Sequence, residues 1–127
     1  MDIGRLNGVI RALEAGQVPT MAFARAEREE AVVFGGSGLD AVLFEMEHSP
    51  WDGHSLRDAL QWMLNRRRVI EGGTLAPPVT PLVRIPANGG EMNQWLAKQA
   101  LDAGVYGVVW PHVATVEQAR NAVAACR

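Results

Sequence analysis

Two acids and a histidine stand together where one apolar run of the sequence ends. The run closes in Glu45, Glu47 and His48, and Ser49-Pro50 then turns the chain. An imidazole titrates near neutral pH, so it can take and return a proton when a carboxylate fixes its tautomer. We therefore interpret His48 as a candidate acid/base group. The alternative is an ordinary hydrogen-bonded loop histidine.

The two glutamates are a candidate acidic surface. Glu45 and Glu47 are two residues apart at a strand end, and alternate residues of a strand point to the same face. Two carboxylates on one face can bind the waters of a hard divalent cation. Two solvated carboxylates with no ligand fit the residue types equally well.

A single arginine stands in a second apolar run. Arg84 has aliphatic residues on both sides, and its guanidinium keeps its proton and must find an anion or other acceptors. The fork of the guanidinium matches a substrate carboxylate. A structural salt bridge to Glu45 or Glu47 is an equal alternative.

Three further residues are weaker candidates. His54 is expected in the first turn of a helix, and His112 follows a strand end at the mouth of the expected pocket. Cys126 is the only cysteine of the sequence, so no internal disulfide can form and a reducing cytoplasm is the expected compartment. We interpret Cys126 as a small apolar residue or a chain-end thiol.

The sequence around these residues repeats one pattern, a short apolar strand followed by a longer amphipathic segment. Helical spacing of apolar residues, or a capping box, marks each segment after the second, third and fourth strands. The strands are expected at residues 19–24, 40–45, 80–85 and 105–110. The helix signals are Leu56, Leu60, Met63 and Leu64; Met92, Trp95 and Leu96; and Thr115 with Gln118.

Strands that are apolar on both faces and alternate with helices indicate a parallel sheet covered by helices. The predicted fold class is therefore α/β. Either a small open sheet or part of a (β/α)8 barrel fits, and four βα units are about half of such a barrel. Because reactive groups gather at the carboxyl ends of parallel strands, residues 45–48 and Arg84 are expected in one pocket.

Composition argues against several classes of protein. The net charge of the 127 residues is −2, and the basic run at residues 66–68 lacks interleaved aromatics, so we interpret it as a solvated helix end and expect no nucleic-acid partner. No stretch reaches the roughly 18 apolar residues of a membrane span. Apolar residues at Ile3, Leu6, Ile10 and Leu13 indicate an N-terminal helix rather than a secretory signal.

The glycines at residues 35–38 precede a strand, which indicates a helix stop rather than a phosphate loop.

Three stretches together carry a family resemblance. They are EMEHSP at residues 45–50, PLVR at residues 81–84, and ALDAGVYGVVWPHVATVEQARNAV at residues 100–123. The chain resembles the HpcH/HpaI aldolase/citrate lyase family, which are metal-dependent class II pyruvate aldolases. The resemblance implies a TIM (β/α)8 barrel, of which residues 1–127 are a single partial domain, the N-terminal half with its first four βα units.

The resemblance also implies a reaction, a carbon–carbon lyase that cleaves or forms 4-hydroxy-2-oxo acids through a metal-stabilised pyruvate enolate. By motif, His48 matches the general base, Arg84 the substrate-binding transition-state stabiliser, and Asp102 an aspartate that raises the basicity of the histidine. Glu45 and Glu47 match positions near the water shell of the metal. The direct ligands of that divalent cation (Mg, Mn or Co) are expected outside this chain.

The implied partners are pyruvate and an aldehyde, in a cytoplasmic homo-oligomer with no nucleic acid and no membrane. Half a barrel leaves unpaired edges at its first and fourth strands, which favours association. Two alternatives therefore stay open. One is a non-catalytic half-barrel that serves as an assembly or interaction module, and the other is a different metal-dependent barrel enzyme on a small oxo acid, such as a citryl-type lyase.

Overall fold

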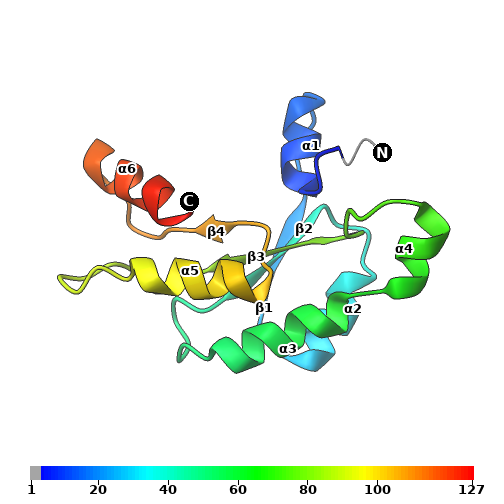
Figure 1. Ribbon diagram of the computed structural model, residues 1–127, viewed down its shortest axis with the longest axis horizontal. Coiled ribbons are helices and arrows are strands. Elements are labelled where there is room, and N and C mark those ends of the chain that lie inside the picture. The colour runs from blue at the N-terminus through cyan, green and yellow to red at the C-terminus, as the bar shows by residue number, and fades with distance from the viewer. Residues whose placement is uncertain (1–3) are drawn as a thin grey trace.

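Four parallel strands form one sheet in chain order. The computed structural model describes residues 4–127, and every neighbouring pair in the order β1-β2-β3-β4 is parallel (Figure 1). The predicted parallel α/β class is confirmed. The strands are β1 (Met21–Ala24), β2 (Ala41–Glu45), β3 (Thr80–Arg84) and β4 (Val108–Val109).

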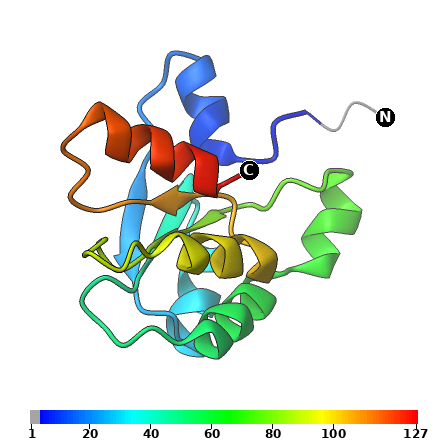
Figure 2. The same ribbon diagram turned by 60° about the vertical axis from the view of Figure 1, so that its left-hand side comes forward.

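Helices connect the strands and cover the sheet. The middle helices α2, α3 and α5 pack on one side, α1 lies on the other side, and α6 lies beside β4 (Figures 1 and 2). In the described part of the chain the helices are α1 (Gly8–Glu14), α2 (Arg28–Gly35), α3 (Gly53–Met63), α4 (Arg66–Gly72), α5 (Gln94–Ala103) and α6 (Val116–Ala125).

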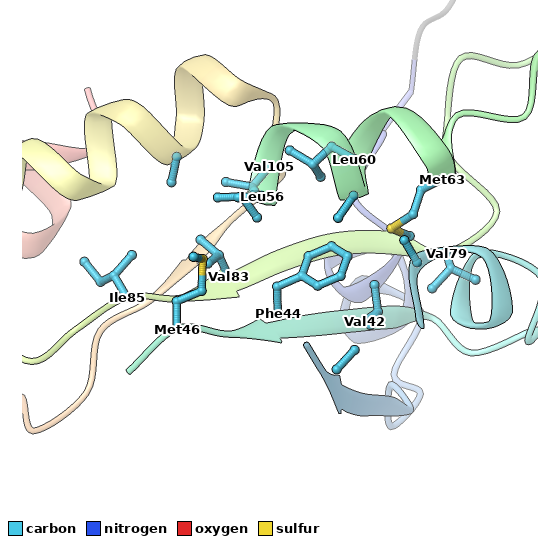
Figure 3. Packing of buried hydrophobic residues seen from close by; sticks show 14 of the residues in the cluster. Val42, Phe44, Met46, Leu56, Leu60, Met63, Val79, Val83, Ile85 and Val105 are labelled. Atoms are coloured by element: carbon cyan, nitrogen blue, oxygen red, sulfur yellow. The ribbon is translucent and has the colours of Figure 1, made fainter. Parts of the chain in front are cut away.

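The main core lies between the sheet and the middle helices. Val42, Phe44 and Val83 point from β2 and β3 toward α3, whose Leu56 is fully buried against them (Figure 3). Burying side chains of this size stabilises a fold by about 1.5–3 kcal/mol each, so this layer holds the strands in register. It is the rigid support on which the strand ends are built.

The opposite face of the sheet carries the polar strand ends. Leu43 and Leu82 point to this face and pack with Ala41 under Val9 of α1. Side chains alternate along a strand, so the next residues on this face are Glu45 and Arg84. The register pairs these two residues directly across β2 and β3. The alternation that buries the leucines therefore sets the two charged side chains side by side.

Several local predictions hold in the structure. Helix α2 ends at Gly35, as expected from the glycine cluster. Thr115 and Gln118 form the predicted capping box at the start of α6. Leu6, Ile10 and Leu13 lie in or just before α1, whereas Ile3 lies outside the described residues. Residues 4–127 include no helix long and apolar enough to cross a membrane.

Other boundaries differ from the prediction. Helix α3 ends at Met63, so Leu64 does not join its buried face and stays exposed. The basic run at residues 66–68 begins the separate helix α4 instead of ending α3, because the Asn65 side chain accepts a hydrogen bond from the Arg68 backbone. The link between α3 and β3 therefore holds a helix of its own.

The fourth strand is shorter than predicted. Residues 105–110 were expected to be strand, but β4 contains two residues. The preceding chain still pairs with β3, since Tyr106 N–H donates to the Pro81 carbonyl and Val83 N–H donates to the Gly107 carbonyl. The sheet thus ends in a short edge strand at β4 and in β1 at the other edge.

Candidate active site

The carboxyl ends of β2 and β3 bring three predicted charged residues together. The Arg84 guanidinium pairs with the Glu45 carboxylate, and its Nε lies 3.1 Å from Glu47 Oε2. All three side chains are largely shielded from solvent. Glu45 and Glu47 share one face, as predicted from their spacing.

Arg84 forms ion pairs with both glutamates, but one of its N–H donors has no regular hydrogen bond. Its Nε and Glu45 Oε2 are buried and make these ion pairs without a hydrogen bond of regular geometry. Buried polar atoms of this kind are uncommon in folded proteins and call for an explanation.

Glu45 shapes the turn that follows β2. Its Oε1 accepts hydrogen bonds from the backbone N–H groups of Glu47 (2.7 Å) and His48 (3.2 Å), and the Ser49 hydroxyl donates to its carbonyl (2.9 Å). Burial raises the pKa of Glu45, but its pairing with the Arg84 guanidinium and the hydrogen bonds from the two backbone N–H groups outweigh this effect. The net pKa of Glu45 is lowered.

His48 lies at the open side of this cluster. Its Nε2 is 3.5 Å from Glu47 Oε2, and its side chain is 73% exposed whereas that of Glu47 is 7% exposed. The nearby carboxylate expected to orient the imidazole is therefore Glu47. A solvent-facing ring held by a buried carboxylate suits proton exchange with a bound molecule.

A weaker candidate, His112, and a residue that the sequence did not single out, Phe23, also reach the site. His112 Nε2 lies 3.1 Å from Glu47 Oε1, and Arg84 Cζ lies 4.7 Å from the centre of the Phe23 ring in β1. The sequence signal for His112 was its place after a strand end. Phe23 had no such signal, because its contact depends on β1 lying beside β2.

Asp102 is placed elsewhere. It is exposed near the carboxyl end of α5, two residues before the Gly104 turn that leads toward β4. A helix between parallel strands runs back against them, so its carboxyl end lies near the amino ends of the strands. The structure therefore does not bring Asp102 beside His48, and Glu47 takes the expected place against the imidazole.

A metal held directly by these residues does not fit the arrangement. Over residues 4–127, no three His, Cys, Asp or Glu side chains are grouped to hold an ion. Both Glu45 and Glu47 are engaged by Arg84. Their oxygens form a charge-paired network rather than an open ligand set.

The lowered pKa of Glu45 predicts an acid-dependent loss of stability. Its pKa is lower in the folded chain than in the unfolded chain, so the ionised group stabilises the fold above the unfolded pKa. That contribution is lost as the pH falls below about 4.3, the ordinary glutamate value, through the folded pKa. We expect Glu45→Gln to flatten this acid limb in urea unfolding measured from pH 3 to 7.

Glu71→Gln is the matched control for this experiment. Glu71 pairs with Arg67 on the surface, where both side chains are exposed. In this control the free energy of unfolding should fall at low pH as it does in the wild type. Parallel pH profiles for the wild type and Glu45→Gln would count against the role of Glu45.

Comparison with known proteins adds the family. The model of the family described as HpcH/HpaI aldolase/citrate lyase matches residues 20–127. The chain is 35% identical over 102 residues to a hydroxypyruvate/pyruvate aldolase of Roseobacter denitrificans, covering 80% of this chain and 34% of that protein. It is 32% identical over 123 residues to the 4-hydroxy-4-methyl-2-oxoglutarate aldolase cghB of Chaetomium globosum, covering 95% and 40%.

Solved structures agree with the sequence relatives. An HpcH/HpaI aldolase/citrate lyase family protein from Burkholderia cenocepacia superimposes with a TM-score of 0.73 at 27% identity, covering 95% of this chain and 43% of that one. An HpcH/HpaI aldolase from Desulfitobacterium hafniense shares the fold with a TM-score of 0.70 at 20% identity. The chain thus spans 34% to 43% of the length of these four proteins. By its sequence match and its parallel βα architecture, the chain belongs to the HpcH/HpaI aldolase/citrate lyase family.

Proposed function

We propose that this chain supplies the proton-transfer and anion-binding groups of an aldolase acting on small 2-oxo acids. The observation that carries the proposal is the cluster of Glu45, Glu47, His48 and Arg84 at the carboxyl ends of β2 and β3. The family match and the relatives named as aldolases support a lyase. The proposed substrates are pyruvate with an aldehyde, or the 4-hydroxy-2-oxo acid formed from them.

Each residue of the cluster has a role in this proposal. Arg84 binds the substrate carboxylate or the enolate oxygen through its guanidinium, whose fork of N–H donors matches a carboxylate. His48 takes the proton of the 4-hydroxyl group during carbon–carbon cleavage and returns it during synthesis. Glu47 holds the imidazole and stabilises the imidazolium that forms. Glu45 holds Arg84 and the turn that carries His48.

We further propose that a divalent cation, Mg2+, Mn2+ or Co2+, works with this site through direct ligands outside these 127 residues. The charge-paired state of Glu45 and Glu47 supports ligands elsewhere, as does the partial coverage of the relatives. A cation of this kind acts as a Lewis acid on a carbonyl oxygen. Glu45 and Glu47 would lie near its water shell.

The proposed setting is a partial barrel. Residues 1–127 would form the N-terminal half of a (β/α)8 barrel, with its first four βα units, and further strands would pair with the edges at β1 and β4. A homo-oligomer in the cytoplasm is the assembly and compartment we propose. The single cysteine supports a reducing compartment.

Exchange of the pyruvate methyl protons in D2O tests the function. The full-length protein that contains this sequence should exchange them, as followed by proton NMR, when Mn2+ is present. The exchange should stop after chelation and return when Mn2+ is added back, because enolate formation needs a partner for its charge. The 127-residue chain by itself should exchange slowly or not at all.

The result separates the proposal from its rivals. Failure of the full-length protein to exchange pyruvate, together with stable self-association, would favour a non-catalytic assembly module, for which the two sheet edges are the supporting observation. Exchange that continues at full rate after chelation would count against the metal. A panel of 4-hydroxy-2-oxo acids and citryl-type substrates distinguishes an aldolase from a citryl-type lyase.

A further inference from the structure

The Glu47 carboxylate is shielded from solvent, yet each of its oxygens meets a nitrogen. Oε2 lies 3.1 Å from Arg84 Nε and 3.5 Å from His48 Nε2, and Oε1 lies 3.1 Å from His112 Nε2. A buried carboxylate is costly unless it is paired and hydrogen-bonded. The His112 contact is therefore part of what keeps Glu47 in one orientation.

His112 reaches Glu47 from a backbone conformation that most residues avoid. Its φ angle is +57°, in the left-handed region, whereas Pro111 and Val113 on either side have ordinary φ angles. Histidine is one of the residues found there more often than average, at an energetic cost. Unusual conformations of this kind persist where the surrounding structure holds them and cluster at functional sites. Here the strained residue is the one whose side chain touches the buried carboxylate.

The loop after β4 is thereby tied to the end of β2. Two imidazoles hold the same carboxylate, His48 at one oxygen and His112 at the other. His112 is one of the groups that hold the Glu47 carboxylate, and Glu47 in turn contacts both His48 and Arg84. His112 itself is 77% exposed, so burial does not explain its placement.

We propose that His112 is a positioning residue that fixes Glu47 and, through Glu47, the relative placement of the His48 imidazole and the Arg84 guanidinium. The catalytic meaning of this link rests on the proposed function. The link itself, from His112 through Glu47 to His48, is a structural statement and does not depend on turnover. A spectroscopic test can therefore be read without any activity.

The test compares two substitutions at position 112 of the 127-residue chain. Asparagine tolerates the left-handed conformation, so His112→Asn keeps the loop but is too short to place a donor where Nε2 lies. His112→Gln carries an amide N–H at about the reach of Nε2. Long-range proton–nitrogen NMR spectra report the ring nitrogens of His48 directly. We expect His112→Asn to shift the His48 ring signals and His112→Gln to return them toward the wild-type positions.

His54 provides the matched control. It is exposed in the first turn of α3 and lies outside the cluster. Its ring signals should stay unchanged in both His112 variants, and His54→Asn should leave the His48 signals in place. Unchanged His48 signals in His112→Asn would overturn the proposal. An equal shift caused by His54→Asn would overturn it too.

Circular dichroism shows whether His112→Asn is folded. If it is not, the variant Glu47→Gln tests the same contact from the other side. In Glu47→Gln the ring signals of His112 and His48 should both move while those of His54 stay in place. Static His112 signals in Glu47→Gln would contradict the contact.

The catalytic part of the proposal has a separate readout. His112→Asn should slow pyruvate proton exchange by the full-length protein about a hundredfold, the order expected when a reacting group is displaced by about 1 Å, with partial rescue by His112→Gln. If the wild-type protein shows no exchange, the proposed function fails and the spectroscopic result still decides the link. If exchange is normal in His112→Asn, the positioning role fails while the proposed function stands.

Discussion

Replacing His48 with alanine is expected to lower the rate of pyruvate proton exchange by the full-length protein about 10²- to 10⁴-fold. This range is the usual contribution of a positioned general base. The side chain of His48 is 73% exposed, and exposed substitutions usually change the free energy of unfolding by about 0.5 kcal/mol or less. Proton NMR in D2O measures the exchange rate, and urea unfolding checks that the fold is kept. The loss would then report chemistry rather than stability.

The control for this variant is His54→Ala. His54 donates its backbone N–H to Asp52 in the turn before α3 and makes no contact with the Glu47 carboxylate. Its replacement should leave the exchange rate near that of the wild type. Added imidazole should restore part of the activity of His48→Ala, because a free base can occupy the solvent-facing space left by the ring. Undiminished exchange in His48→Ala would rule out the assigned base.

Replacing Arg84 with methionine is expected to destabilise the folded chain by about 3–5 kcal/mol. Methionine fills a similar volume, but Glu45 and Glu47 lose the guanidinium that pairs with both of them. Removing one partner of a buried ion pair leaves an uncompensated charge, which is the source of a loss of this size. Urea unfolding at neutral pH measures the change. Pyruvate binding should also be lost, since no guanidinium is left for its carboxylate.

Two comparisons sharpen the Arg84 result. Arg67→Met breaks the pair with Glu71, whose partners are 84% and 59% exposed, and should cost no more than about 1 kcal/mol. Adding Glu45→Gln and Glu47→Gln to Arg84→Met removes the two stranded charges and should recover much of the lost stability. Equal losses for Arg84→Met and Arg67→Met would show that the Arg84 network is not a buried one.

Much of the fold followed from local patterns. The continuous apolar runs of β2 and β3 predicted strands buried on both faces, and Glu45 and Arg84 stand at the ends of those runs. The capping box at Thr115 predicted the start of α6. These signals are local, since each depends on residues within a few positions of one another. Helix ends such as Met63 were harder to predict, because the Asn65 cap that starts the next helix competes with continuation of α3.

The sequence by itself determined which chemistry is possible here: an imidazole, two carboxylates and a guanidinium at the ends of neighbouring parallel strands. Only the tertiary structure decided which of these groups touch. It set Glu47 against His48, brought His112 and Phe23 into the cluster, and left Asp102 near the other end of the strands. Glu47 and His48 are neighbours in the sequence, but the contacts of Glu47 with Arg84 and His112, and of Arg84 with Phe23, join segments far apart in the chain. Their distances depend on strand order, register and loop conformation. The type and spacing of neighbouring residues do not predict such distances. The contacts of Glu47 with Arg84 and His112 could therefore be identified only from the tertiary structure.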